Sequence, residues 1–169
     1  EGLRTAFGKI RNDVIGVSME SYTALLSRIK NNEELVGVLG LGYVGLPLAV
    51  LFAKKGVHVL GFEKTAGKAA PDFPDSGIGG DAVIICVPTP LDKFKKPDMR
   101  FIENACTDIG KHMKKGVFIS LESTTYPTTT ENVMRPIIEK HSGLKHGVDF
   151  WLCFSPERVD PGNKLYKTE

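Results

Sequence analysis

Three glycines follow an apolar run with the spacing of a phosphate-binding turn. The segment 40–45 reads Gly-Leu-Gly-Tyr-Val-Gly and leads into an apolar helical stretch. In such a strand–turn–helix unit, the first glycine permits a sharp turn, the second leaves room for a pyrophosphate, and the third lets the helix pack on the strand. Amide groups and the helix dipole then attract the phosphates. We therefore expect a dinucleotide site that includes Gly40, Gly42, Tyr43, Val44 and Gly45, the alternative being a glycine turn that only packs.

An acidic residue, Glu63, ends the second apolar run. At this position its carboxylate can accept hydrogen bonds from a ribose diol. Its charge would repel a 2′-phosphate, so we expect NAD rather than NADP, although Lys64, next in the chain, weakens this preference. The alternative for Glu63 is a solvated acid at the end of a strand.

Further polar residues follow three later apolar runs. Thr89 and Thr124 could bond a cofactor ribose, a substrate or an ordered water, or they could be turn residues bonded to their own backbone. Glu157 could act as a general base or hold a water, and Arg158 could pair with a substrate phosphate. A surface acid and a salt bridge to a neighbouring acid are the alternatives for this last pair.

Alternating apolar runs and amphipathic stretches place these residues on strands and helices. The sequence predicts strands over 35–39, 57–62, 81–87, 117–121 and 150–154. The order indicates an α/β fold with a doubly wound parallel sheet, a Rossmann-type domain. Ligands bind beyond the carboxyl ends of such strands, so one edge should carry the whole site. The residues expected there are the glycine turn, Glu63, Pro88, Thr89, Ser123, Thr124 and Glu157.

The helices between the strands carry start signals of their own. Helices are expected over 19–30 and 44–55, and two more follow the third and fourth strands. Asp98 should cap the first of these two, whose inner face would carry Ile102, Cys106, Ile109 and Met113. The residues 128–131, Thr-Thr-Thr-Glu, form the pattern of a capping box that opens the second, which should extend to His141 and kink at Pro136.

The segment 64–80 interrupts this alternation. Pro71, Pro74 and four glycines prevent a long helix or strand there. An ordinary dinucleotide fold has a helix and a third strand at this point, and the segment is too short for both. We therefore expect a loop, and a sheet whose strand-three region is shortened.

Composition limits the function classes. The chain has 169 residues, 41% of them hydrophobic and 25% charged, which is ordinary for one globular domain. A net charge of +2 without a Lys/Arg block argues against nucleic acid, and no apolar run reaches the length of a membrane span. Cys86, Cys106 and Cys153 are far apart, and the four histidines do not cluster. We expect reduced thiols in the cytoplasm and no metal site.

The chain divides into two parts before any motif is considered. Residues 1–34 should form a tail and an amphipathic helix, and 35–169 the sheet domain. Tyr22, Leu25, Leu26 and Ile29 share one face of that helix, which should dock on the sheet domain, with a partner surface as the alternative. Because the chain begins with Glu1 and ends without a closing motif, we expect a piece of a longer protein.

Four motifs in one order resemble the N-terminal domain of the UDP-glucose/GDP-mannose dehydrogenase family. They are Gly-Leu-Gly-Tyr-Val-Gly-Leu-Pro-Leu, Val-Pro-Thr-Pro-Leu, Glu-Ser-Thr-Thr-Tyr-Pro and Phe-Ser-Pro-Glu-Arg-Val-Asp-Pro-Gly-Asn. The last two are most similar to the UDP-N-acetylglucosamine/galactosamine 6-dehydrogenase branch. The resemblance extends from Val36 to about Asn163, apart from the loop after Glu63.

The resemblance implies NAD-dependent oxidation of the C6 hydroxyl of a UDP-sugar to a uronate. The substrate expected from it is a UDP-N-acetylhexosamine. Such enzymes serve polysaccharide biosynthesis in the cytoplasm, and the full-length parent is expected to be a homo-oligomer. The glycine turn and Glu63 would then bind NAD, with Pro88, Thr89 and Ser123 near the cofactor. Thr124 would position NAD or the catalytic water, and Glu157 would serve in hydrolysis of the thioester intermediate.

The chain departs from the family pattern at three points. The loop 64–80 replaces a helix and a strand beside the adenosine half of the site, and Thr128 stands where the branch usually has glycine. The central and substrate-capping domains are absent, and with them the nucleophilic cysteine. We therefore expect this chain alone to be inactive. A truncated, non-catalytic nucleotide-binding module is the alternative function.

Overall fold

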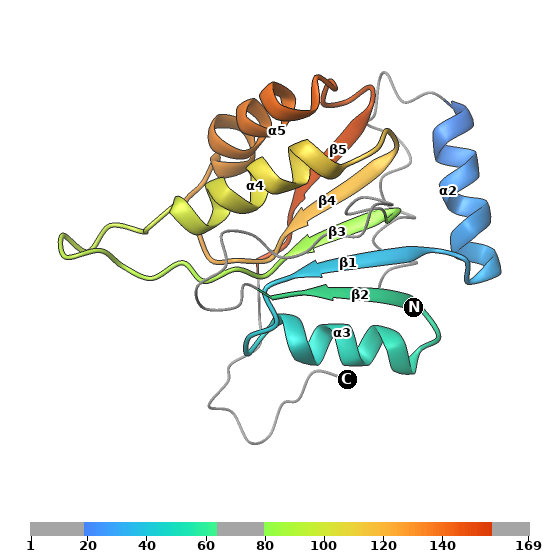
Figure 1. Cartoon of the computed structure of the whole chain (residues 1–169), viewed down its shortest axis with the longest axis horizontal. Coiled ribbons are helices and arrows are strands. Elements are labelled where there is room, and N and C mark those ends of the chain that lie inside the picture. Colours follow the sequence, from blue (N-terminus) through green and yellow to red (C-terminus); the bar gives the residue numbers. More distant parts are fainter. Residues whose placement is uncertain (1–18, 64–79, 157–169) are drawn as a thin grey trace.

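A computed structural model describes residues 19–63 and 80–156 of the chain (Figure 1). The expected tail and almost all of the segment 64–80 lie outside the described residues. So do Glu157 and Arg158. The described residues contain the glycine turn, Glu63 and the ends of the next three strands.

Five parallel strands form a single sheet in the order β2-β1-β3-β4-β5. Their bounds are Leu35–Leu39 for β1, His58–Phe62 for β2, Ala82–Ile85 for β3, Val117–Leu121 for β4 and Phe150–Phe154 for β5. The chain moves from β1 to β2 in one direction and then returns past β1 to β3, β4 and β5. The doubly wound parallel sheet predicted from the sequence is therefore confirmed. Among the described residues no strand lies beyond β2.

Helices cover both faces of this sheet (Figure 1). The helix α3 (Gly45–Lys54) packs on one face, where Leu48 and Phe52 meet a buried cluster centred on Val38 and Ile84. On the other face lie α4 (Arg100–His112), a π-helical turn η2 (Thr130–Met134) and α5 (Arg135–Ser142). Both faces are apolar because the strands of a doubly wound sheet are buried on both sides.

The larger core lies under α4 and α5. Ile85, Ile102, Ile119, Ile138 and Phe150 are completely buried there. Burial of each such side chain contributes roughly 1.5–3 kcal/mol. The inner face expected for the helix after Asp98 is confirmed, because its predicted residues are buried or packed against this core.

The helix α2 (Met19–Asn31) lies at the amino end of the sheet. Arg28 forms an ion pair with Asp81 over 3.3 Å, and the Asp81 carboxylate also accepts the Leu35 amide at 2.9 Å. The predicted helix is confirmed. Leu25 and Ile29 are only half-buried, so the predicted stripe makes a partial contact with the domain.

The two helix starts had different outcomes. The Asp98 carboxylate accepts the amide of Arg100, the first residue of α4, at 3.1 Å, so the predicted cap is present. The predicted capping box at residues 128–131 is wrong. Thr128 adopts a left-handed φ of 73°, its hydroxyl bonds the Asn132 side chain, and a π-helical turn begins at Thr130 without a side-chain cap.

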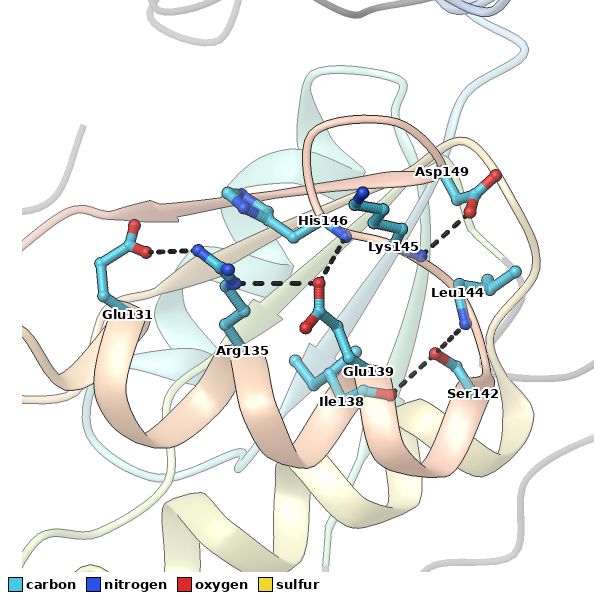
Figure 2. A network of polar contacts seen from close by, with 9 residues as sticks. All are labelled: Glu131, Arg135, Ile138, Glu139, Ser142, Leu144, Lys145, His146 and Asp149. Carbon is cyan, nitrogen blue, oxygen red and sulfur yellow. Dashed lines mark hydrogen bonds and ion pairs between the residues drawn. The ribbon is translucent and has the colours of Figure 1, made fainter.

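A polar network holds the far end of this helical segment (Figure 2). Arg135 lies between Glu131 and Glu139, with N–O distances of 3.3 and 3.7 Å. The Glu139 carboxylate also accepts the His146 amide at 3.0 Å, which fixes the loop that leads into β5. The predicted kink site, Pro136, lies in the first turn of α5, directly after the π-helical turn. Because helical backbone continues from Thr130 through Ser142, Pro136 lies inside the segment, where it cannot supply the N–H of a helical hydrogen bond.

Candidate functional site at the carboxyl edge

Two glycines of the turn after β1 are required by packing. Gly40 has a left-handed φ of 90°, and its amide donates to the Phe62 carbonyl at 2.8 Å. A Cβ atom at Gly40 would lie 2.6 Å from the Cys86 carbonyl oxygen, and one at Gly45 would overlap the Gly40 carbonyl. Both positions therefore exclude a side chain, and they bring α3 and β3 against the turn.

Gly42 is different. No atom lies within 4 Å of the place where its Cβ would be, and its φ is outside the left-handed region. The residue is exposed, so neither packing nor backbone strain explains the missing side chain. The open space stands beside the first turn of α3, where a helix N-terminus attracts phosphate. Its position fits a pyrophosphate that approaches the backbone.

Glu63 closes the other side of the turn. One oxygen of its carboxylate accepts the Leu41 amide at 2.5 Å, which connects the end of β2 to the glycine turn. The side chain is exposed. The acid therefore lies beside the turn, as the ribose role requires. The role of the Leu41 amide could not be predicted from the sequence, because nearly every residue type supplies a backbone N–H donor.

The ends of β3 and β4 are joined by Ser123. Its hydroxyl donates to the Val87 carbonyl at 2.7 Å, and only 7% of the residue is exposed. This bond brings Pro88 and Thr89 beside Thr124. Thr89 is half-buried and Thr124 is exposed, so both are accessible at the edge, whereas the Ser123 hydroxyl points into the loop.

A buried threonine, Thr129, and the half-buried Thr125 support the loop after Thr124. The Thr125 and Thr129 hydroxyls lie 2.9 Å apart, and Thr129 donates to the Tyr126 carbonyl at 2.8 Å. Thr129 is 2% exposed. These contacts were not predicted, since each threonine by itself has the composition of an ordinary turn residue.

Contacts between neighbouring strand ends unite the candidate residues into one row. Glu63 bonds the turn after β1, Gly40 packs on the end of β3, and Ser123 joins β3 to β4. The Ser155 amide donates to the Leu121 carbonyl at 3.0 Å, so the end of β5 lies next to the end of β4. Glu157, two residues beyond Ser155, is outside the described residues.

Two of the three described thiols, those of Cys106 and Cys153, are poorly suited to nucleophilic attack. Burial, with a smaller effect of Glu103, raises the pKa of the Cys106 thiol to about 12. Burial also raises the pKa of Cys153, which donates to the Ser120 hydroxyl at 3.2 Å. The thiolate is the reactive form, and both environments disfavour it.

Neither metal ligation nor membrane crossing is indicated by the described part of the chain. No group of three or more His, Cys, Asp or Glu side chains is arranged to hold a metal ion. No helix among these residues is long and apolar enough to cross a membrane.

Curated relatives and solved structures agree on the family. UDP-N-acetyl-D-glucosamine 6-dehydrogenase from Pseudomonas aeruginosa is 40% identical over 157 residues, which cover 78% of this chain and 37% of that protein. UDP-N-acetyl-D-mannosamine dehydrogenase from Pyrococcus horikoshii is 34% identical to this chain, and the match covers 38% of that protein. The solved structure of the Pyrococcus horikoshii UDP-D-ManNAc dehydrogenase matches 76% of this chain, with a TM-score of 0.65 and 34% identity.

The alignment with the Pseudomonas protein also shows a deletion. It runs over 157 positions but covers 78% of a 169-residue chain, about 132 residues. About 25 aligned positions of the relative therefore have no counterpart here. The chain spans little more than a third of the length of the relatives it matches.

The family model for the UDP-glucose/GDP-mannose dehydrogenase family, NAD binding domain, matches residues 68–169. The match contains three of the four motifs and confirms the family resemblance, and it confirms NAD as the cofactor of this domain. The fold and the glycine turn described above are consistent with it. The chain belongs to the UDP-glucose/GDP-mannose dehydrogenase family and corresponds to the NAD-binding domain of that family.

Proposed function

We propose that this chain is the cofactor domain of an NAD-dependent nucleotide-sugar 6-dehydrogenase, with a UDP-N-acetylhexosamine as substrate. The observation that carries the cofactor role is the open space at Gly42, between two glycines that the fold itself requires. The substrate class rests on relatives that are described as UDP-N-acetyl-D-glucosamine and UDP-N-acetyl-D-mannosamine dehydrogenases. Residues 35–169 form this domain in the proposal, and 1–34 precede it.

Each edge residue receives a role that its geometry allows. The turn residues Gly40, Gly42, Tyr43, Val44 and Gly45 hold the pyrophosphate, and Glu63 accepts the ribose hydroxyls. Pro88 and Thr89 line the cofactor side of the edge, where Ser123 positions them through the Val87 carbonyl. Thr124, exposed at the end of β4, positions the cofactor or a water.

The chemistry needs groups beyond those described here. Bound NAD would accept a hydride from the C6 carbon of the sugar. Glu157, which follows the last strand, serves as the base or water-holding residue in the proposal. The nucleophilic cysteine is assigned to another segment, because the pKa values of Cys106 and Cys153 are raised. This chain alone therefore binds the cofactor without turnover.

Calorimetric titration of the 169-residue chain with NAD tests the cofactor role, and NADP is the matched comparison. We expect heat of binding with NAD and weaker binding with NADP, because the Glu63 carboxylate repels a 2′-phosphate. Equal affinity for both would remove the role of Glu63. No binding of either would contradict the working site.

The substrate class needs a longer protein that contains this chain. With such a protein, NADH absorbance should rise with UDP-N-acetylglucosamine or UDP-N-acetylgalactosamine and remain flat with GDP-mannose. Glu157→Gln should then slow completion of the oxidation, and unchanged turnover would contradict its role. A cytoplasmic, homo-oligomeric parent in polysaccharide biosynthesis fits this proposal, since the three cysteines remain thiols.

The second candidate is a non-catalytic nucleotide-binding module. It is favoured by the roughly 25 aligned positions of the relative that have no counterpart here. Titration separates two forms of this candidate. Weak but measurable NAD binding supports the module, whereas an absence of binding by a folded chain means that the glycine turn has only a structural role.

A further inference from the structure

The outer edge of β2 has backbone groups directed away from the sheet. Phe62 faces β1, because its carbonyl accepts the Gly40 amide at 2.8 Å, and Leu39 pairs with Phe62 in the register. Successive residues of a strand direct their N–H and C=O groups to opposite sides. Leu60 therefore also faces β1, while Val59 and Gly61 direct both backbone groups outward.

Within β2 itself, no residue gives the usual protection of an edge against pairing. The strand His-Val-Leu-Gly-Phe contains no proline, lysine or acid, the residues that commonly block an edge. His58 and Gly61 are exposed. Within the described residues β2 pairs only with β1.

Charges flanking β2 select the direction of a partner strand. Lys54 and Lys55 precede the strand, Glu63 follows it, and all three side chains are exposed. An antiparallel second copy would bring the lysines of one chain near Glu63 of the other. A parallel copy would place like charges together, which is unfavourable across strands. The edge is thus complementary to itself in the antiparallel direction.

We propose that the outer edge of β2 pairs antiparallel with the same edge of a second copy of this chain. In a register centred on Leu60, Val59 of each copy lies opposite Gly61 of the other. Each of these two pairs exchanges both N–H···O=C bonds. The two-fold axis closes the assembly at a dimer with one continuous sheet, and no edge of this kind remains open. The inference does not rest on the proposed function.

Sedimentation velocity of the full chain over a concentration series measures the assembly. We expect a monomer–dimer equilibrium, with a dimer of twice the 18.5 kDa chain mass. Amide hydrogen exchange should show slower exchange at Val59 and Gly61 as the concentration rises. A monomer throughout the series, or open-ended polymers, would overturn the proposal.

Val59→Pro tests the edge directly. The substitution removes an N–H that points outward, so the bonds from β2 to β1 remain, and proline is tolerated at such edge positions. Two symmetric hydrogen bonds are lost, and the dimer dissociation constant should rise roughly 30-fold. Leu60→Pro is the matched control: its N–H faces β1, so circular dichroism should show loss of the fold. A Val59→Pro dimer of unchanged strength contradicts the proposal.

Variants that exchange two charges test the dimer independently if Val59→Pro does not fold. Lys55→Glu should weaken the dimer, because the new acid would lie near Glu63 of the second copy. The double variant Lys55→Glu/Glu63→Lys should recover it, because the two charges are exchanged together. Failure of the double variant to recover the dimer would overturn the antiparallel register.

Discussion

The substitution Gly42→Ala separates cofactor binding from folding. A Cβ at this position meets no atom within 4 Å, and the residue is not in the left-handed region. The folded chain can therefore accept the methyl group. Replacement of glycine at such a site reduces the entropy of the unfolded chain and stabilises a protein by about 0.4–1 kcal/mol. We expect a small rise in the free energy of unfolding.

Cofactor binding should change in the opposite direction. The methyl group would stand where the pyrophosphate approaches the backbone, so at least one hydrogen bond to a charged phosphate is lost. Such bonds contribute about 1.5–3 kcal/mol. The dissociation constant for NAD should consequently rise about 10- to 150-fold. The larger Gly42→Val variant should abolish binding with the same preserved fold.

Urea denaturation followed by circular dichroism measures the first effect, and calorimetric titration with NAD measures the second. Gly45→Ala is the contrasting control, because its Cβ would overlap the Gly40 carbonyl and the chain should lose its fold. Unchanged NAD affinity in a folded Gly42→Ala chain would refute the assignment of the open space to the pyrophosphate. A collapse of stability in Gly42→Ala would refute the packing argument.

Three further predictions concern the supporting structure. Thr128→Gly should raise the free energy of unfolding, measured in urea, by up to about 1 kcal/mol. The reason is that relief of the left-handed φ of 73° exceeds the entropy cost of glycine. Thr128→Ala retains a Cβ and should give no such rise. Ser123→Ala should lower the free energy of unfolding by about 1 kcal/mol and also weaken NAD binding, because the bond from Ser123 to the Val87 carbonyl positions Thr89. Weaker binding with unchanged stability would instead indicate that Ser123 contacts the cofactor directly. The Lys145 amide and then the Lys115 ammonium lower the pKa of Asp149 below 3.8, so its contribution to stability is present above that pH and is lost as the pH falls through the depressed pKa. Urea titrations at decreasing pH should show that the free energy of unfolding of Asp149→Asn, lower than that of the unsubstituted chain near neutral pH, becomes equal to it in acid. A difference that does not depend on pH would contradict this pairing.

Local pattern was sufficient for most of the fold. The predicted strands 35–39, 117–121 and 150–154 agree with β1, β4 and β5 residue for residue. Their apolar runs are bounded by glycine, proline or charged residues, so the sequence alone marks both ends. The order of strands and helices then leaves few topologies, because parallel connections have a fixed hand.

One local pattern failed, and one contact lies outside any local pattern. The sequence of residues 128–131 matches a capping box, but Thr128 adopts a left-handed φ and its hydroxyl accepts the Asn132 side chain. The bond from the Ser123 hydroxyl to a carbonyl 36 residues earlier in the chain could not be predicted either, and the place of Ser123 at the cofactor stays a prediction. No local window contains both partners of such a contact.

The glycine spacing by itself predicted a tight strand–turn–helix unit of the kind that binds a dinucleotide, because such a turn needs positions without a side chain. The tertiary structure decided what each glycine does: Gly40 and Gly45 lie against neighbouring backbone, and only Gly42 faces open space. The sequence likewise indicated that the strand-three region is short. The outward direction of two backbone positions of β2 follows only from the pairing of β2 with β1. The alternation along a strand has no fixed phase until a neighbouring strand is in place.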